Sequence, residues 1–131
     1  MAEFTVPAAG AICWRELATK DLDKATDFYR QMFGWTIEQS KMSPMVYQEI
    51  HTDGQARGGM MQIDENWPPG VPSHWQSYVA VENADERAEK IKAEGGKINH
   101  GPFDAPSIGR IAMCMDPAGA PFAIIQFTQP E

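Results

Sequence analysis

The feature of this chain that most limits its fold is a pattern that occurs twice. In each copy, a predicted strand is followed by an amphipathic helix and then by three further strands. Leu22 and Ala84 begin the apolar stripes of the two helices, 62 residues apart, and Gly34 and Gly96 end the helices at the same offset. The copies share a pattern and little identity. Because one copy alone cannot bury both its helix and a sheet face, we expect two copies to fold together.

The first copy spans about residues 10–64. Its helix is predicted from apolar residues at three- and four-residue spacing, with Asp21 as the N-cap and Gly34 as the C-cap. Turn residues separate the stretches around the helix. Strands are predicted over residues 11–17, 35–39, 46–51 and 55–63.

A linker at residues 65–73, rich in proline and glycine, precedes the second copy at about residues 74–128. There Asn83 is the predicted N-cap, with Glu86 three residues on, as in a capping box. Strands are predicted over residues 75–81, 97–100, 110–115 and 121–128. The sequence therefore predicts a single domain made of two β-α-β-β-β modules.

Charge and composition narrow the function classes. The chain has 131 residues and a net charge of −7, which disfavours nucleic acid and anionic membranes as partners. No apolar stretch approaches the roughly 20 residues of a membrane span, and residues 1–7 have no signal-peptide pattern. Cys13 and Cys114 lie in apolar stretches without metal or redox spacing, which favours reduced thiols over a disulfide. We therefore expect a cytoplasmic protein.

Two motifs carry a resemblance to a known family. The segment from Asp21 to Trp35 is similar to the pattern D-(x)n-FY-x-x-x-(F/L)-G-(W/F) of the glyoxalase / bleomycin-resistance / dioxygenase (vicinal oxygen chelate) superfamily. The segment from Asp116 to Phe122 resembles its D-P-x-G-x-x-(F/I) hairpin, and Gly109-Arg110 resembles the glyoxalase-like subgroup of small bacterial proteins. The resemblance implies an α+β fold whose modules form a curved eight-stranded mixed sheet with a half-barrel cleft. It also implies a homodimer.

The resemblance implies four metal-ligand positions, on the first and last strands of each module. In this sequence they fall on Trp14, on Met60 or Met61, on Gln76 and on Ala123. Of these side chains, Gln76 alone suits a hard cation, and one carboxamide cannot hold such an ion against water. We therefore expect no metal and no other cofactor. A divalent metal remains the alternative, because a shift of one residue would bring two further candidates into the cleft, Glu16 and His74.

The cleft can instead be lined by side chains that bind an organic molecule. Trp14 and Tyr78 are either core aromatics or the wall of a site for a flat ligand, with Glu16 and Gln76 as polar contacts. Either Met60 or Met61 faces the cleft. The remaining candidates are Ala123 and Arg110, and Arg110 either binds an anionic ligand group or forms a surface ion pair.

Three functions fit these features. The first is a glyoxalase-like protein that lacks the usual metal ligands and binds a small organic molecule in the cleft. The second is a metal-dependent lyase or dioxygenase with atypical ligands, drawn from Glu16, His74 and Gln76. The third is an interaction module whose sheet face is filled by its own side chains. The fold supports many activities, so the choice between enzyme and binding protein stays open at this point.

Overall fold

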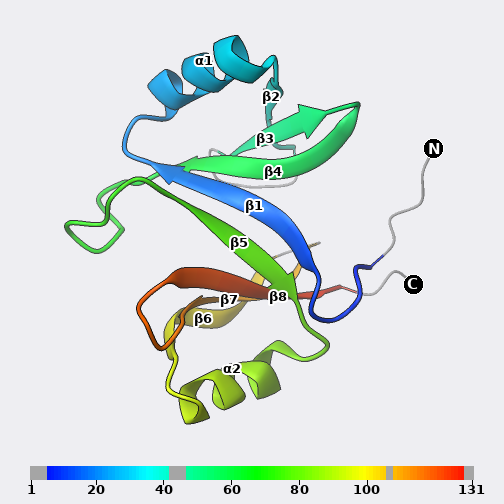
Figure 1. Cartoon of the computed structure of the whole chain (residues 1–131), viewed down its shortest axis with the longest axis vertical. Coiled ribbons are helices and arrows are strands. Elements are labelled where there is room, and N and C mark those ends of the chain that lie inside the picture. Colours follow the sequence, from blue (N-terminus) through cyan, green and yellow to red (C-terminus); the bar gives the residue numbers. More distant parts are fainter. Residues whose placement is uncertain (1–5, 42–46, 106–107, 129–131) are drawn as a thin grey trace. The chain divides into compact units, whose positions relative to one another are not determined.

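The computed structural model describes residues 6–41, 47–105 and 108–128. Its elements follow the order β-α-β-β-β twice, as predicted (Figure 1). They are β1 (Ile12–Thr19), α1 (Leu22–Phe33), β2 (Thr36–Gln39), β3 (Tyr47–Thr52), β4 (Gln55–Gln62), β5 (His74–Ala80), α2 (Ala84–Ala93), β6 (Lys97–Ala105), β7 (Gly109–Met115) and β8 (Pro121–Phe127).

The hydrogen-bonded order of the strands is β2-β3-β4-β1-β5-β8-β7-β6. The pairs β1–β4 and β5–β8 are parallel, whereas β2–β3, β3–β4, β6–β7 and β7–β8 are antiparallel. This order confirms the predicted α+β fold with an eight-stranded mixed sheet. The sheet is open, with β2 and β6 as its edges.

The chain divides into two compact units. One is residues 14–76, and the other joins the N-terminal segment up to Cys13 with the chain from Ser77 onward. Both boundaries fall inside strands, β1 and β5. The module bounds predicted from the sequence, residues 10–64 and 74–128, stay a prediction.

In the unit of residues 14–76, α1 packs on one face of the strands. The core there consists of Leu17, Leu22, Ile37, Ile50 and Met60. The caps of α1 are those predicted: the Asp21 side chain accepts a hydrogen bond from the Lys24 backbone N–H, and Gly34 ends the helix at φ 66°. A left-handed conformation at this position suits glycine, which has no Cβ to clash.

In the other unit, α2 packs on the strands β7 and β8. Ala84, Ala112, Cys114 and Ile124 form its core. The Asn83 side chain caps α2 by accepting a hydrogen bond from the Glu86 backbone N–H, as expected. Neither helix of the described ranges combines the length and apolar character that a bilayer span requires.

The prediction for β6 was too short, because the strand continues past residue 100 to Ala105. Pro102 lies inside it, beyond the predicted end at residue 100. A proline has no N–H to donate, so it is tolerated at the edge of a sheet, where β6 lies. The pairing of β6 with β7 shifts register on both sides of His100, which accommodates the interruption.

Candidate functional site

The candidate site lies on the face of the strands opposite α1, in the unit of residues 14–76. Side chains alternate along a strand, so Leu17 faces α1 while Trp14 and Glu16 point to the other face. Glu16 lies opposite Gly59 in the β1–β4 pair, and Tyr47 lies opposite Met61 in the β3–β4 pair. Residues from three strands therefore meet on this face.

A hydrogen-bond network centred on the Glu16 carboxylate joins these residues. The Tyr47 hydroxyl donates to Glu16 Oε2 at 2.8 Å, and Gln76 Nε2 donates to Glu16 Oε1 at 3.2 Å. Trp14 Nε1 in turn donates to the Tyr47 oxygen at 2.9 Å. Glu16 is 3% exposed and Gln76 is 7% exposed. Because a buried carboxylate is costly unless it is hydrogen-bonded, these donors explain how Glu16 is accommodated.

Gly59 provides the surface on which the Tyr47 ring lies. A Cβ at Gly59 would approach the Tyr47 hydroxyl to 2.0 Å and the ring carbon Cζ to 2.2 Å. Such distances are far below van der Waals contact, so Gly59 must lack a side chain for Tyr47 to reach Glu16. Sequence reasoning missed both Tyr47 and Gly59. The sequence signal for the close approach of a side chain to this strand is the glycine pair Gly58-Gly59 inside it.

The environment of Tyr47 fixes its chemical role. Burial raises the pKa of the Tyr47 phenol well above its ordinary value, and the nearby Glu16 carboxylate raises it further, while the hydrogen bond from Trp14 acts in the opposite direction. The phenol therefore keeps its proton at neutral pH. Tyr47 acts here as a hydrogen-bond donor and not as a nucleophile.

These side chains do not fit a divalent metal. Both Glu16 oxygens already accept hydrogen bonds, from Tyr47 and from Gln76. The indole N–H of Trp14 and the phenol O–H of Tyr47 are donors, whereas a hard cation requires several converging oxygen or nitrogen acceptors. Within residues 6–41, 47–105 and 108–128, no group of three or more His, Cys, Asp or Glu side chains is arranged to hold a metal ion.

The two other candidates from this part of the chain lie elsewhere. Met60 is fully buried and belongs to the core beneath α1, so by alternation its neighbour Met61 points to the face that carries Glu16. His74 lies in β5, where its Nδ1 is 2.8 Å from the Pro72 carbonyl oxygen. Glu16 and Gln76, both from the predicted set, are joined by a direct side-chain hydrogen bond.

The remaining candidates belong to the second unit. Tyr78 and Ala123 are buried neighbours in the β5–β8 pair. Arg110 donates to Asp85 at 2.8 and 3.1 Å and to Asp104 at 2.9 Å. These contacts match the surface ion pair that was the alternative for Arg110, and the two carboxylates raise the pKa of its guanidinium.

Comparison with known proteins identifies the family. The model of the Glyoxalase/Bleomycin resistance protein/Dioxygenase superfamily matches residues 11–124. The chain belongs to this superfamily. Among its relatives, CFP32 of Mycobacterium bovis, a glyoxylase by name, is 38% identical over 92% of this chain and 46% of its own length. The anthracycline biosynthesis protein DnrV of Streptomyces peucetius is 33% identical over 89% of this chain and 47% of its own length. The chain thus spans about half the length of these relatives.

Solved structures share the fold of this chain. Methylmalonyl-CoA epimerase from Streptomyces coelicolor aligns with a TM-score of 0.61 over 94% of this chain and all of its own chain, at 17% identity. The protein BH1468 from Bacillus halodurans aligns with a TM-score of 0.64 over 95% of this chain and 99% of its own, at 11% identity. At these identities the likeness establishes the fold alone.

Proposed function

We propose that this chain is a metal-independent domain of the superfamily that binds a small organic molecule on the sheet face of residues 14–76. The observation that carries the proposal is the Glu16 carboxylate, held between Tyr47 and Gln76 beside the Trp14 indole. An aromatic wall with a few fixed polar groups is typical of small-molecule sites. A ligand hydroxyl or amine would be bound by the carboxylate, and a flat ring would pack against Trp14.

The names of the relatives guide the choice of first ligands. One relative is named for glyoxylase activity and another for anthracycline biosynthesis. A first panel therefore contains α-hydroxyketones, hydroxylated planar aromatic compounds and an anthracycline. The superfamily hosts both enzymes and binding proteins, so turnover of each bound compound is measured alongside affinity.

Thermal shift followed by isothermal titration calorimetry tests the proposal. A compound that stabilises the wild-type protein is expected to bind at least tenfold more weakly to Glu16→Gln and Tyr47→Phe, since a hydrogen bond to a charged group contributes about 1.5–3 kcal/mol. The control is Glu89→Gln, which removes an exposed carboxylate of α2 that pairs with Lys92. It should leave affinity unchanged.

Metal analysis separates this function from the alternative of a metal-dependent lyase or dioxygenase. Protein purified without chelator is assayed for stoichiometric metal, and nickel, zinc, manganese and iron are added in turn. The proposal expects no bound metal and no rise in melting temperature. A tightly held ion whose binding is abolished by Glu16→Gln would replace it with the enzyme alternative.

We also propose that the chain forms a homodimer in the cytoplasm. Phe28 and Met32 expose 53% and 55% of their surface on α1, which favours association with a second copy. Both cysteines are free thiols, in keeping with a reducing compartment. Light scattering coupled to size-exclusion chromatography tests the dimer, and a monomer mass at 100 µM, about the concentration of a structural sample, would contradict it.

A further inference from the structure

We propose that the unit of residues 14–76 carries a further site, a pocket that binds small organic cations. The pocket has a volume of about 390 Å³ and lies between the C-terminal end of α1, the beginning of β2 and the turn that joins β3 to β4. This volume is within the range of natural ligand pockets, roughly 300–1,000 Å³. The site uses neither Glu16 nor Tyr47 nor Gln76, so it goes beyond the function proposed above.

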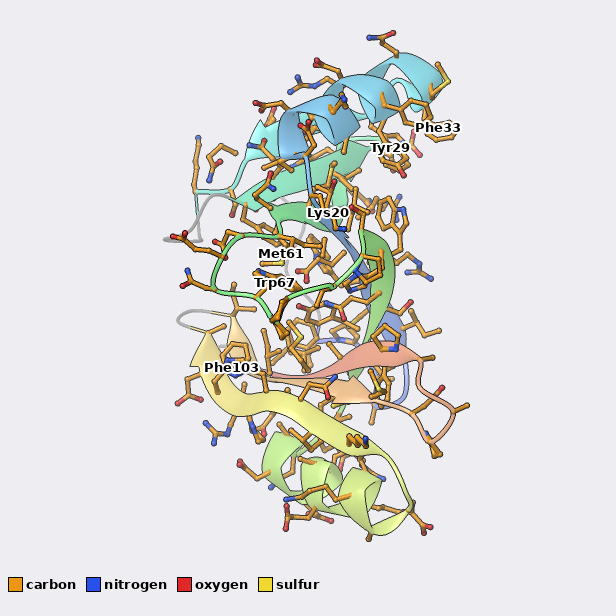
Figure 2. All side chains as sticks on the ribbon, turned by 90° about the vertical axis from the view of Figure 1, so that its left-hand side faces the viewer. Lys20, Tyr29, Phe33, Met61, Trp67 and Phe103 are labelled. Carbon is orange, nitrogen blue, oxygen red and sulfur yellow. The ribbon has the colours of Figure 1, made fainter. Side chains whose placement is uncertain are left out.

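Two aromatic rings form one side of the pocket. Gly34 turns the chain at the end of α1, and this places Phe33 and Trp35 together in the lining, with ring centroids 5.4 Å apart. Trp35 stacks on Tyr29 at 5.1 Å with an interplanar angle of 10°, and Tyr29 and Phe33 lie close together on α1 (Figure 2). The Trp35 ring is therefore fixed by its aromatic neighbours Tyr29 and Trp75, while Phe33 remains 62% exposed.

Acidic side chains also line the pocket. Glu38 on β2 and Asp53 in the β3–β4 turn are exposed carboxylates of the lining. The ring of His51, also in the lining, is held by Glu49 through an Nε2–Oε1 contact of 3.1 Å. Among the nine residues that line the pocket, all within the described part of the chain, none is lysine or arginine. Two guanidinium groups lie beside the lining and are held by hydrogen bonds there: Arg57 Nε donates to Oγ1 of the lining residue Thr52 at 3.2 Å, and Arg30 donates to the carbonyl oxygen of Ile37, next to Glu38.

This combination selects for positive charge. A cation over an aromatic face is attracted by the ring quadrupole, and nearby carboxylates add Coulomb attraction. A carboxylate or phosphate ligand would instead be repelled by Glu38 and Asp53. A neutral aromatic molecule would contact the rings but would gain no electrostatic attraction from the carboxylates. The geometry therefore points to an amine or quaternary ammonium group joined to an apolar body.

Three probes of similar size test the charge preference. They are benzyltrimethylammonium, benzyl alcohol and phenylacetate, titrated into the full chain at low ionic strength. Binding is followed by NMR through the Trp35 indole and His51 ring signals, assigned with Trp35→Phe and His51→Gln. We expect the cation to bind about fivefold more tightly than the neutral probe, and the anion to bind more weakly still. Equal affinities for the three probes would overturn the proposal.

Variants locate the binding. Glu38→Gln and Asp53→Asn should each weaken cation binding about threefold, and Phe33→Ala about threefold as well. Asparagine also tolerates the left-handed backbone of residue 53, φ 52°, so that variant removes charge without strain. The control is Asp27→Asn, an exposed carboxylate of α1 outside the lining. If cation affinity is unchanged in all three lining variants, or falls equally in the control, the proposal of a cation site in this pocket is refuted.

One further variant separates this site from the proposed function. Tyr47→Phe should weaken binding of the organic ligand at Glu16 at least tenfold while leaving benzyltrimethylammonium affinity unchanged. If that variant removes cation binding and the lining variants do not, the cation binds at the Glu16 network and the pocket proposal is wrong. If Tyr47→Phe loses binding of the first-panel compounds and keeps binding of the cation, the pocket proposal stands and the two sites are separate.

Discussion

Substituting Gly59 by alanine tests whether the close approach of Tyr47 builds the Glu16 network. The new Cβ would lie 2.0 Å from the Tyr47 hydroxyl and 2.4 Å from its ring carbon Cε1, so the tyrosine must leave its position. Its departure breaks the hydrogen bond to the Glu16 carboxylate, about 1.5–3 kcal/mol, and the one from Trp14, about 0.5–1.5 kcal/mol. Alanine restricts the unfolded chain and returns about 0.4–1 kcal/mol. We expect a net destabilisation of about 1–4 kcal/mol.

The assay is urea denaturation of a double-mutant cycle. Gly59→Ala is measured alone and in the Tyr47→Ala background, where the clashing ring is absent. Gly59 is not among the glycines with a positive φ angle, so its backbone conformation suits alanine as well. Gly59→Ala should therefore cost less than about 0.5 kcal/mol in the Tyr47→Ala background, giving a coupling energy of at least about 0.5 kcal/mol. An equal loss of stability in both backgrounds would refute the reasoning.

Two further predictions concern pH and helix capping. Because the folded-state pKa of Tyr47 is raised, its contribution to stability is complete below about pH 10 and is lost as the pH rises further. Chemical denaturation from pH 8 to 11 should show a steeper alkaline decline for the wild-type protein than for Tyr47→Phe, and parallel curves would contradict the assignment. Asp21→Ala should lower the free energy of unfolding by about 1 kcal/mol, because it removes the acceptor for the Lys24 N–H, whereas Asp21→Asn should retain most of the stability. Equal losses in the two variants would assign the effect to charge and not to the cap.

The fold was predictable because its signals are local. The caps at Asp21, Gly34 and Asn83 follow from the backbone groups that every helix end leaves unpaired, and the structure has all three. Alternation along one strand was enough to predict that Trp14 and Glu16 share a face, where both contact Tyr47 in the structure. The strand around Pro102 was cut short because its position at a sheet edge depends on the strand order, which no local pattern contains.

The partners within the candidate site were not predictable in the same way. Glu16 and Gln76 are 60 residues apart, and their contact depends on which strands pair and in which register. The sequence does not give the register between the strand of Tyr47 and the strand of Gly59. Their close approach on one face could therefore not be predicted. The choice between Met60 and Met61 stayed open for the same reason, because a shift of one residue exchanges the two faces of a strand.

The Glu16 carboxylate links the absence of the expected metal ligands to the proposed function. A carboxylate that is 3% exposed needs compensation, either from a cation or from hydrogen-bond donors. Here Tyr47 and Gln76 supply the donors, and Gly59 makes room for one of them. A ligand that bonds to Glu16 must therefore add to these contacts or displace one. Displacement of Gln76 would leave the Trp14–Tyr47 pair in place, so the first substitution that changes ligand preference without loss of the fold should be at Gln76.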